Sequence, residues 1–152
     1  MNIINRARAS GQSKRDSDPI RVGDVMSKAV ITLSPSDTVA KSVELMATGD
    51  FRHLVIADDE QKVLGVISDR DILSVKGRIS EWRVKKIQEV MTPMPITVTQ
   101  ETLLSSAVAT MIAKKINCLP VIDIAGALCG IVTSTDVMKF SQHLLESMEK
   151  RT

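Results

Sequence analysis

The amino-acid sequence predicts an α/β (α+β) fold, in which two β-α-β-β-α repeats pack through their sheets with pseudo-two-fold symmetry. Residues 22–73 align without a gap on residues 87–138, and ten of the 52 aligned pairs are identical. Each copy alternates short apolar runs with apolar residues at helical spacing. A unit of about 50 residues buries too little apolar surface to be stable alone, so the two copies are expected to share a core.

The expected elements follow the same order in both copies. Those of the first copy are a strand at 30–33, a helix from Val39 with Ser36 and Asp37 as candidate caps, strands at 54–57 and 63–67, and a helix from Ser68 through Leu73. Those of the second copy are a strand at 96–98, a helix at 103–112, strands at 119–122 and 128–132, and a helix from Thr133. Polar turns separate the paired strands in each copy.

The repeat also sets the expected domain boundaries. They are an N-terminal tail (1–19), a first repeat (20–74), a linker (75–86), a second repeat (87–142) and a C-terminal helical extension (143–152). The tail is polar and basic and has no apolar period, so we expect residues 1–18 to be loose and sensitive to proteases. The linker carries five basic residues and one acidic residue.

Composition narrows the classes of function. Hydrophobic residues make up 43% and charged residues 25% of the 152 residues, as in globular proteins. The net charge is only +2 and three residues are aromatic, which argues against stacking on single-stranded nucleic acid. No uncharged stretch is long enough for a membrane span, and the N-terminus lacks the apolar run of a signal peptide. Two isolated cysteines suggest reduced thiols in the cytoplasm and no zinc site.

Three motifs occur in the same order in the sequence. They are Val22-Gly23-Asp24-Val25-Met26; Leu54-Val55-Ile56 with its counterpart Leu119-Pro120-Val121-Ile122-Asp123; and Gly65-Val66-Ile67-Ser68-Asp69-Arg70-Asp71 with its counterpart Gly130-Ile131-Val132-Thr133-Ser134-Thr135-Asp136. Together they resemble a tandem pair of CBS (cystathionine β-synthase) domains, a Bateman module. The resemblance covers residues 20–142. It implies a standalone regulatory module, not an enzyme, that binds AMP, ADP or ATP, or in some members NAD or S-adenosylmethionine.

The repeated Gly-x-x-Ser/Thr-x-x-Asp pattern has two physical interpretations. Gly65 and Gly130 lie inside expected strands, where glycine often marks the close approach of another backbone or a ligand. The hydroxyl and carboxylate of the pattern can form a capping box at the start of a helix. The same carboxylate can accept both hydroxyls of a ribose, with phosphate favoured near the helix N-terminus. The resemblance favours ribose binding at one site or more.

The family pattern implies two clefts, each with residues of both copies. The first combines Lys28, Arg52, His53, Thr133, Thr135 and Asp136. The second combines Ser68, Arg70, Asp71, Pro93, Asn117 and Cys118. The first cleft is better equipped to bind phosphate because it has more potential donors. Each of three residues also has an interpretation without a ligand. Arg52 can be a solvated surface charge, His53 a strand-edge histidine and Cys118 a packed thiol.

Alternatives for function remain open at this point. A nucleotide-sensing module that signals to an unknown partner is favoured over an interaction scaffold with degenerate clefts. An enzyme has little support, because the nucleotide-binding, metalloprotease and hydrolase motifs are absent. Nucleic acid is an improbable partner of the basic linker. Trp82 and the stripe of Phe140, Leu144 and Met148 need cover, and the resemblance implies a homodimer.

Overall fold

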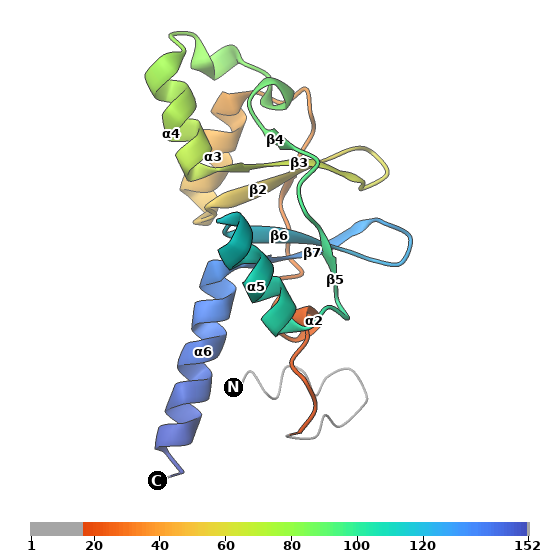
Figure 1. Ribbon diagram of the computed structural model, residues 1–152. Coiled ribbons are helices and arrows are strands. Elements are labelled where there is room, and N and C mark those ends of the chain that lie inside the picture. The colour runs from red at the N-terminus through yellow and green to blue at the C-terminus, as the bar shows by residue number, and fades with distance from the viewer. Residues whose placement is uncertain (1–16, 152) are drawn as a thin grey trace.

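The structure is a computed structural model that describes residues 17–151. The predictions for residues 1–16 of the tail lie outside the described residues. The chain forms two sheets, with the sheet of the first repeat above that of the second in Figure 1. The predicted β-α-β-β-α order is present in both copies, and the predicted fold class is confirmed.

The first repeat supplies most of a four-stranded sheet. Its elements are β1 (Thr32–Leu33), α3 (Val39–Gly49), β2 (His53–Ala57), β3 (Val63–Ser68) and α4 (Asp69–Arg78). β1 runs parallel to β2, and β2 runs antiparallel to β3. The fourth strand, β4 (Thr92–Pro93), comes from the second repeat and pairs with β3. The short 3₁₀ turns η2 (Trp82–Val84) and η3 (Ile87–Glu89) connect the two repeats.

The second repeat forms a three-stranded sheet with the same pairing. Its elements are β5 (Val98–Thr99), α5 (Leu104–Lys114), β6 (Cys118–Ile122), β7 (Leu128–Thr133) and α6 (Ser134–Glu149). β5 is parallel to β6, and β6 is antiparallel to β7. α6 is the longest helix among the described residues and continues without a break into the predicted extension as far as Glu149.

Several element boundaries differ from the sequence prediction. The N-cap of α3 is Thr38, whose hydroxyl accepts the Lys41 N–H at 3.3 Å. Asp37 instead accepts the backbone N–H of Ser34 and the Lys41 ammonium. The short helix α2 (Val22–Val25) was not predicted, because one turn is too short to show a helical period. α4 continues to Arg78, into the segment predicted as linker.

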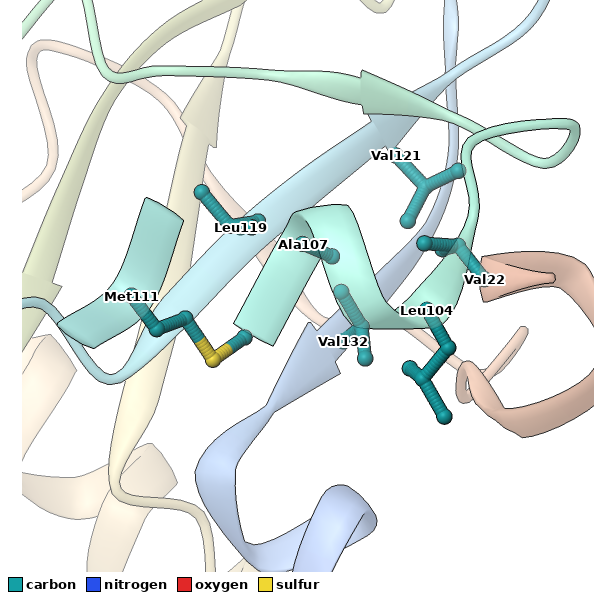
Figure 2. Close-up of a cluster of buried hydrophobic side chains, with 7 residues drawn as sticks. All are labelled: Val22, Leu104, Ala107, Met111, Leu119, Val121 and Val132. Atoms are coloured by element: carbon teal, nitrogen blue, oxygen red, sulfur yellow. The ribbon is translucent and has the colours of Figure 1, made fainter. Parts of the chain in front are cut away.

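Each repeat sends its entry segment onto the other repeat. Val22 of the first copy is fully buried in the core of the second, where Figure 2 shows it beside Leu104 and Val121. Ile87 of the second copy is fully buried in the core of the first. The backbone follows the same exchange, because Ser27 pairs with Ile131 while β4 pairs with β3. Neither core is therefore complete without the other copy's chain.

The strand glycines allow this exchange. A Cβ on Gly65 would lie 2.9 Å from both Met91 Cγ and the carbonyl oxygen of Thr92. A Cβ on Gly130 would lie 2.8 Å from Met26 Sδ and 2.9 Å from the carbonyl oxygen of Ser27. Carbon atoms do not normally approach this closely, so a side chain at either position would push the crossing segment away. The close approach that the sequence predicted is that of the other repeat's backbone.

An apolar layer joins the two sheets. Val55 of the first repeat clusters with Cys118 and Ile131 of the second. Lys62 and Ala127, which are equivalent positions 65 residues apart, pair with each other in an antiparallel bridge. A pair formed by two equivalent positions lies on the axis that relates the copies. The predicted pseudo-two-fold packing through the sheets is therefore present.

Candidate functional site

The two Ser/Thr-x-x-Asp patterns form matching capping boxes at the starts of α4 and α6. The Asp71 Oδ2 accepts the Ser68 N–H at 2.8 Å and its hydroxyl at 2.9 Å. The Asp136 Oδ2 accepts the same two groups of Thr133 at the same distances. Within residues 17–151, Oδ1 of either aspartate accepts no hydrogen bond. The capping role is thus observed, and it leaves one oxygen of each carboxylate available to a ligand.

Strand pairing brings the first residue of β2 and of β6 next to the cap of its own repeat. His53 pairs with Ser68, and Cys118 pairs with Thr133. The neighbouring carbonyls continue the match, because Arg52 accepts the Asp69 N–H at 3.0 Å and Asn117 accepts the Ser134 N–H at 2.9 Å. The same backbone frame therefore carries different side chains in the two repeats.

The residues predicted for the first cleft are divided between the repeats. Lys28 is exposed and follows Ser27, which pairs with Ile131 on β7 two residues before Thr133. Thr135 is exposed on the first turn of α6. In the described part of the chain, no hydrogen bond or ion pair joins Arg52 or His53 to the second-repeat members of this cleft, which are Thr133, Thr135 and Asp136. The assignment of these six residues to one ligand site stays a prediction.

Arg52 and His53 lie in a charged cluster of their own repeat. The Arg52 Nε lies 4.0 Å from Asp69 Oδ2, and both side chains are largely exposed. Burial lowers the pKa of His53 below its ordinary value of 6.5. Asp69 and Asp71 raise that pKa, while Arg52 and Arg70 lower it further. The half-buried imidazole of His53 is thus influenced by two carboxylates and two guanidinium groups.

Two of the six residues predicted for the second cleft lie together across the repeats, and the assignment of the whole set stays a prediction. Arg70 of α4 and Asn117 before β6 line one open cavity of about 470 Å³. Burial, with a smaller contribution from the negative charge of Asp71, raises the pKa of the Cys118 thiol to about 12. Cys118 is therefore a packed, neutral thiol close to the capping carboxylate of the other repeat. Pro93 lies on β4 and pairs with Gly65.

Sequence reasoning missed most of the lining of this cavity. The cavity lies between α5 and α6, and its further lining residues are Val108, Met111, Ile112, Lys115, Ile116, Ser134, Val137 and Met138. The sequence predicts helices at 103–112 and from Thr133 but assigns none of these residues to a ligand site. The sequence feature that could have drawn attention to this region is Ile112, a large apolar residue at the position where the first repeat has Ala47. The cavity accompanies the cleft that the sequence ranked second.

Two other kinds of site have no support in the described residues. Across residues 17–151, no cluster of three or more His, Cys, Asp or Glu side chains is arranged to hold a metal ion. No helix in the same range has the length and apolar character needed to cross a membrane. Cys118 and Cys129 are both free thiols.

Comparison with known proteins identifies the architecture. The family model described as "CBS domain" matches residues 22–78 and again residues 87–143. The chain belongs to the CBS domain family. The two matches cover both copies of the repeat, and each includes the glycine and the Ser/Thr-x-x-Asp pattern of its copy.

Solved CBS structures are similar over most of their length. The putative acetoin utilization protein AcuB from Vibrio cholerae is 32% identical, with a TM-score of 0.78 over 88% of this chain and 98% of that chain. CBSX2 in complex with AMP is 31% identical, with a TM-score of 0.73 over 82% and 97%. The CBS domain pair of MJ0100, solved with 5'-methylthioadenosine and S-adenosyl-L-methionine, is 28% identical, with a TM-score of 0.73 over 79% and 98%.

Curated relatives include a longer enzyme. Inosine-5'-monophosphate dehydrogenase of Methanocaldococcus jannaschii is 28% identical over 99% of this chain. The chain spans 30% of the length of that relative and 22% of the corresponding Mycobacterium tuberculosis enzyme. CBSX2 of Arabidopsis thaliana, described as chloroplastic, is 28% identical and is matched over 67% of its length.

Proposed function

We propose that this CBS pair is a regulatory module that binds an adenine nucleotide or a related adenosyl compound between its repeats. The observation that carries the proposal is the pair of capping aspartates, each with one oxygen fixed by the cap and one oxygen without a partner in the described chain. A carboxylate held in this way is pre-organised to accept the hydroxyls of a ribose. The structures of CBSX2 with AMP and of MJ0100 with adenosyl ligands support this class of ligand.

The side chains assigned to each aspartate suit different groups at the end of the ligand that lies beyond the ribose. Arg52, His53 and Lys28 are potential donors to phosphate, which favours AMP, ADP or ATP at the first cleft. The second cleft combines Arg70 with an apolar cavity and the neutral thiol of Cys118. The apolar part of this lining also suits an adenosyl group with an uncharged end, as in 5'-methylthioadenosine, and the Arg70 guanidinium can bind the carboxylate of S-adenosylmethionine. NAD is a further candidate because it contains the same adenosine unit.

A thermal-melt screen tests the proposal directly. AMP, ADP, ATP, NAD, S-adenosylmethionine and 5'-methylthioadenosine are each added to the full chain. A ligand at 100 times its Kd stabilises the folded state by about 2.7 kcal/mol, which raises Tm by roughly 5–10 °C in a protein of this size. The control is the double variant Asp71→Ala/Asp136→Ala, compared with its own unliganded Tm. No shift with any compound at millimolar concentration would favour the alternative, an interaction scaffold with degenerate clefts.

Signalling requires a partner, and we propose a homodimer as the first level of assembly. Leu145 and Met148 on α6 are 58% and 59% exposed. Phe140 packs on its own core, and Trp82 packs on the core of the first repeat, so of the groups that the sequence left in need of cover, the outer stripe of α6 remains. The module is proposed to act without catalysing a reaction, in a reducing compartment such as the cytoplasm that keeps its two thiols free.

Light scattering measures the assembly. We expect a mass of twice the 16.6 kDa chain at tens of micromolar, and we expect Leu145→Glu/Met148→Glu to return the protein to a monomer. Leu73→Glu is the matched control, because Leu73 is equally exposed but lies on the other repeat. A monomeric mass for the unmodified chain, with and without AMP, would exclude the homodimer.

A further inference from the structure

The segment that joins the repeats carries an unbalanced positive charge. Residues 75–86 contain five basic side chains and a single acidic one, Glu81. The segment runs from the last turn of α4 through η2, at the end of the molecule opposite the C-terminus (Figure 1). This surface is separate from the Ser/Thr-x-x-Asp caps and plays no part in the proposed ligand site.

Trp82 organises two of these charges. Its side chain is half-buried and packs against the core of the first repeat, where η2 contacts α3. The Lys76 Nζ and the Arg83 Cζ each lie 4.6 Å from the centroid of the indole ring. Cation–π contacts at this distance are attractive and hold flexible side chains in place. The ring therefore reduces the entropy that these two cations would lose when they bind an anion.

The cations of this surface lack acidic partners. In the described chain, Lys76, Arg78 and Arg83 form no ion pair, and Glu81 forms none either. Arg78 donates only to the carbonyl oxygen of Ser74, at 3.3 Å. Lys85 behaves differently, since its ammonium lies 3.6 Å from the carboxylate of Glu89. Three neighbouring positive charges thus remain without compensation by the chain itself.

An apolar side chain extends the charged surface. Val84 is 66% exposed on η2, directly after Arg83. Tryptophan and arginine are the residues most enriched among energetic hot spots of protein interfaces, and an apolar neighbour adds contact area. A solvated charge run would not need a fixed indole with cations stacked on it. The composition and the geometry both match a protein-binding surface.

We propose that Lys76, Arg78, Trp82, Arg83 and Val84, the linker patch, form a docking surface for an acidic segment of a partner protein. The positive charge of the patch selects an acidic partner, and Val84 contacts an apolar side chain of that partner. A second copy of this chain presents the same positive charge here, so symmetric self-association through the patch is repulsive. A duplex-DNA-binding protein that makes about 6–10 phosphate contacts uses roughly two to three times what three cations provide. An acidic peptide fits the size of the patch better.

Trp82 is the only tryptophan of the chain, so its fluorescence reports on this patch alone. The full chain is titrated with an acetylated dodecapeptide of glutamates with two central leucines. A peptide with lysines in place of the glutamates and a twelve-nucleotide oligo-dT are titrated in parallel. We expect the glutamate peptide to change the Trp82 emission and to bind more weakly as salt rises. The lysine peptide is expected to have no effect.

Matched variants locate the binding. We expect Lys76→Gln/Arg78→Gln/Arg83→Gln to weaken binding of the labelled glutamate peptide, followed by polarisation, about tenfold or more. The control Lys114→Gln/Lys139→Gln/Lys150→Gln removes three exposed charges elsewhere and is expected to change the affinity by less than about twofold. All six side chains are exposed, so both variants should fold, and an unchanged Tm verifies this. Equal loss in both variants, no emission change with the glutamate peptide, or tighter binding of oligo-dT would overturn the proposal.

Discussion

The two repeats place different chemistry on the same backbone frame. Both aspartates accept the cap hydroxyl at 2.9 Å and the cap N–H at 2.8 Å, so the helix starts of the two repeats are alike. The side chains beside the caps differ completely. The first repeat places Arg52 and His53 there, and the second places Asn117 and Cys118. His53 is a titratable group among charged side chains, and its equivalent Cys118 is a thiol that stays neutral.

This difference separates what the fold needs from what a ligand can recognise. The strand glycines are present in both copies because the other copy's entry segment crosses close to each of them, and the caps are present in both because each one starts a helix. The edge residues have no comparable structural duty, since Arg52 and Asn117 are exposed. The copies can therefore diverge at these positions without loss of the fold. Variants at the strand glycines, at the capping aspartates and at His53 test this difference between the copies.

The largest effect is expected at the shared feature, the strand glycines. Gly65→Val and Gly130→Val each force a side chain against a backbone carbonyl oxygen of the crossing segment. Overpacking of this kind typically costs about 1–3 kcal/mol of unfolding free energy. The two variants should lose similar stability in urea titrations, because the exchange is present on both sides. A large loss at one position only would mean that the two crossings are not equivalent.

Gly77 provides the control for these glycine variants. It lies inside α4, and a Cβ at this position would meet no atom within 4 Å. Alanine is favoured over glycine in a helix by roughly 0.5–1 kcal/mol. Gly77→Ala should therefore raise the unfolding free energy while Gly65→Val lowers it. The opposite signs distinguish close approach from a general sensitivity to glycine replacement.

The second effect concerns affinity and separates the clefts. Loss of hydrogen bonds to a charged group typically costs about 1.5–3 kcal/mol. We expect Asp136→Ala to weaken AMP binding by roughly ten- to a hundredfold and Asp71→Ala to weaken it less, because Arg52, His53 and Lys28 are assigned to the Asp136 cleft. Calorimetric titration of both variants measures the difference. A larger loss at Asp71 would assign AMP to the cleft with the cavity instead.

A conservative variant separates the ligand role of Asp136 from its cap. Loss of a cap costs about 0.5–2 kcal/mol of stability. Asp136→Asn keeps an oxygen that can accept the Thr133 hydroxyl but removes the negative charge. We expect it to recover most of the stability lost in Asp136→Ala and to remain defective in AMP binding. Recovery of both properties together would leave the aspartate with a capping role only.

The fold could be predicted from the sequence because its strongest signals are local. The apolar runs of β2 and β6 and the gapless repeat predict strands, helices and their order. The exchange of entry segments could not be predicted by the same reasoning. Val22 and Ile87 are ordinary apolar residues in sequence, and nothing local tells which core buries them. Gly65 and Gly130 gave the one usable signal, since glycine in a strand indicated a close approach.

The candidate site was less predictable for a related reason. The capping aspartates follow from a short motif, but a cavity depends on which side chains fail to fill the space between two helices. Ile112 and Met138 look like core residues by spacing, yet they line an open cavity. The pKa of Cys118 depends on its burial between the sheets and on Asp71 of the other repeat. Both properties arise from contacts that are distant in sequence.

The smallest expected effect is a pH dependence that belongs to the first repeat alone. The folded-state pKa of His53 is lowered by burial, against the opposing effect of Asp69 and Asp71 and with the added effect of Arg52 and Arg70. Above pH 6.5 the imidazole is neutral in both the folded and the unfolded chain, so its contribution to stability is constant. Below pH 6.5 the unfolded chain binds the proton more readily, and stability falls until the folded-state pKa is reached.

His53→Gln isolates this contribution. The variant removes the titrating ring, and His143, the other histidine of the chain, stays in both proteins. We expect the decline in Tm between pH 6.5 and pH 5 to be shallower in His53→Gln than in the unmodified chain. Cys118→Ser, at the equivalent position of the second repeat, should leave the slope unchanged, because a thiol with a pKa of about 12 does not titrate in this range. Parallel slopes in all three proteins would show that the half-buried imidazole contributes nothing to the acid sensitivity of the fold.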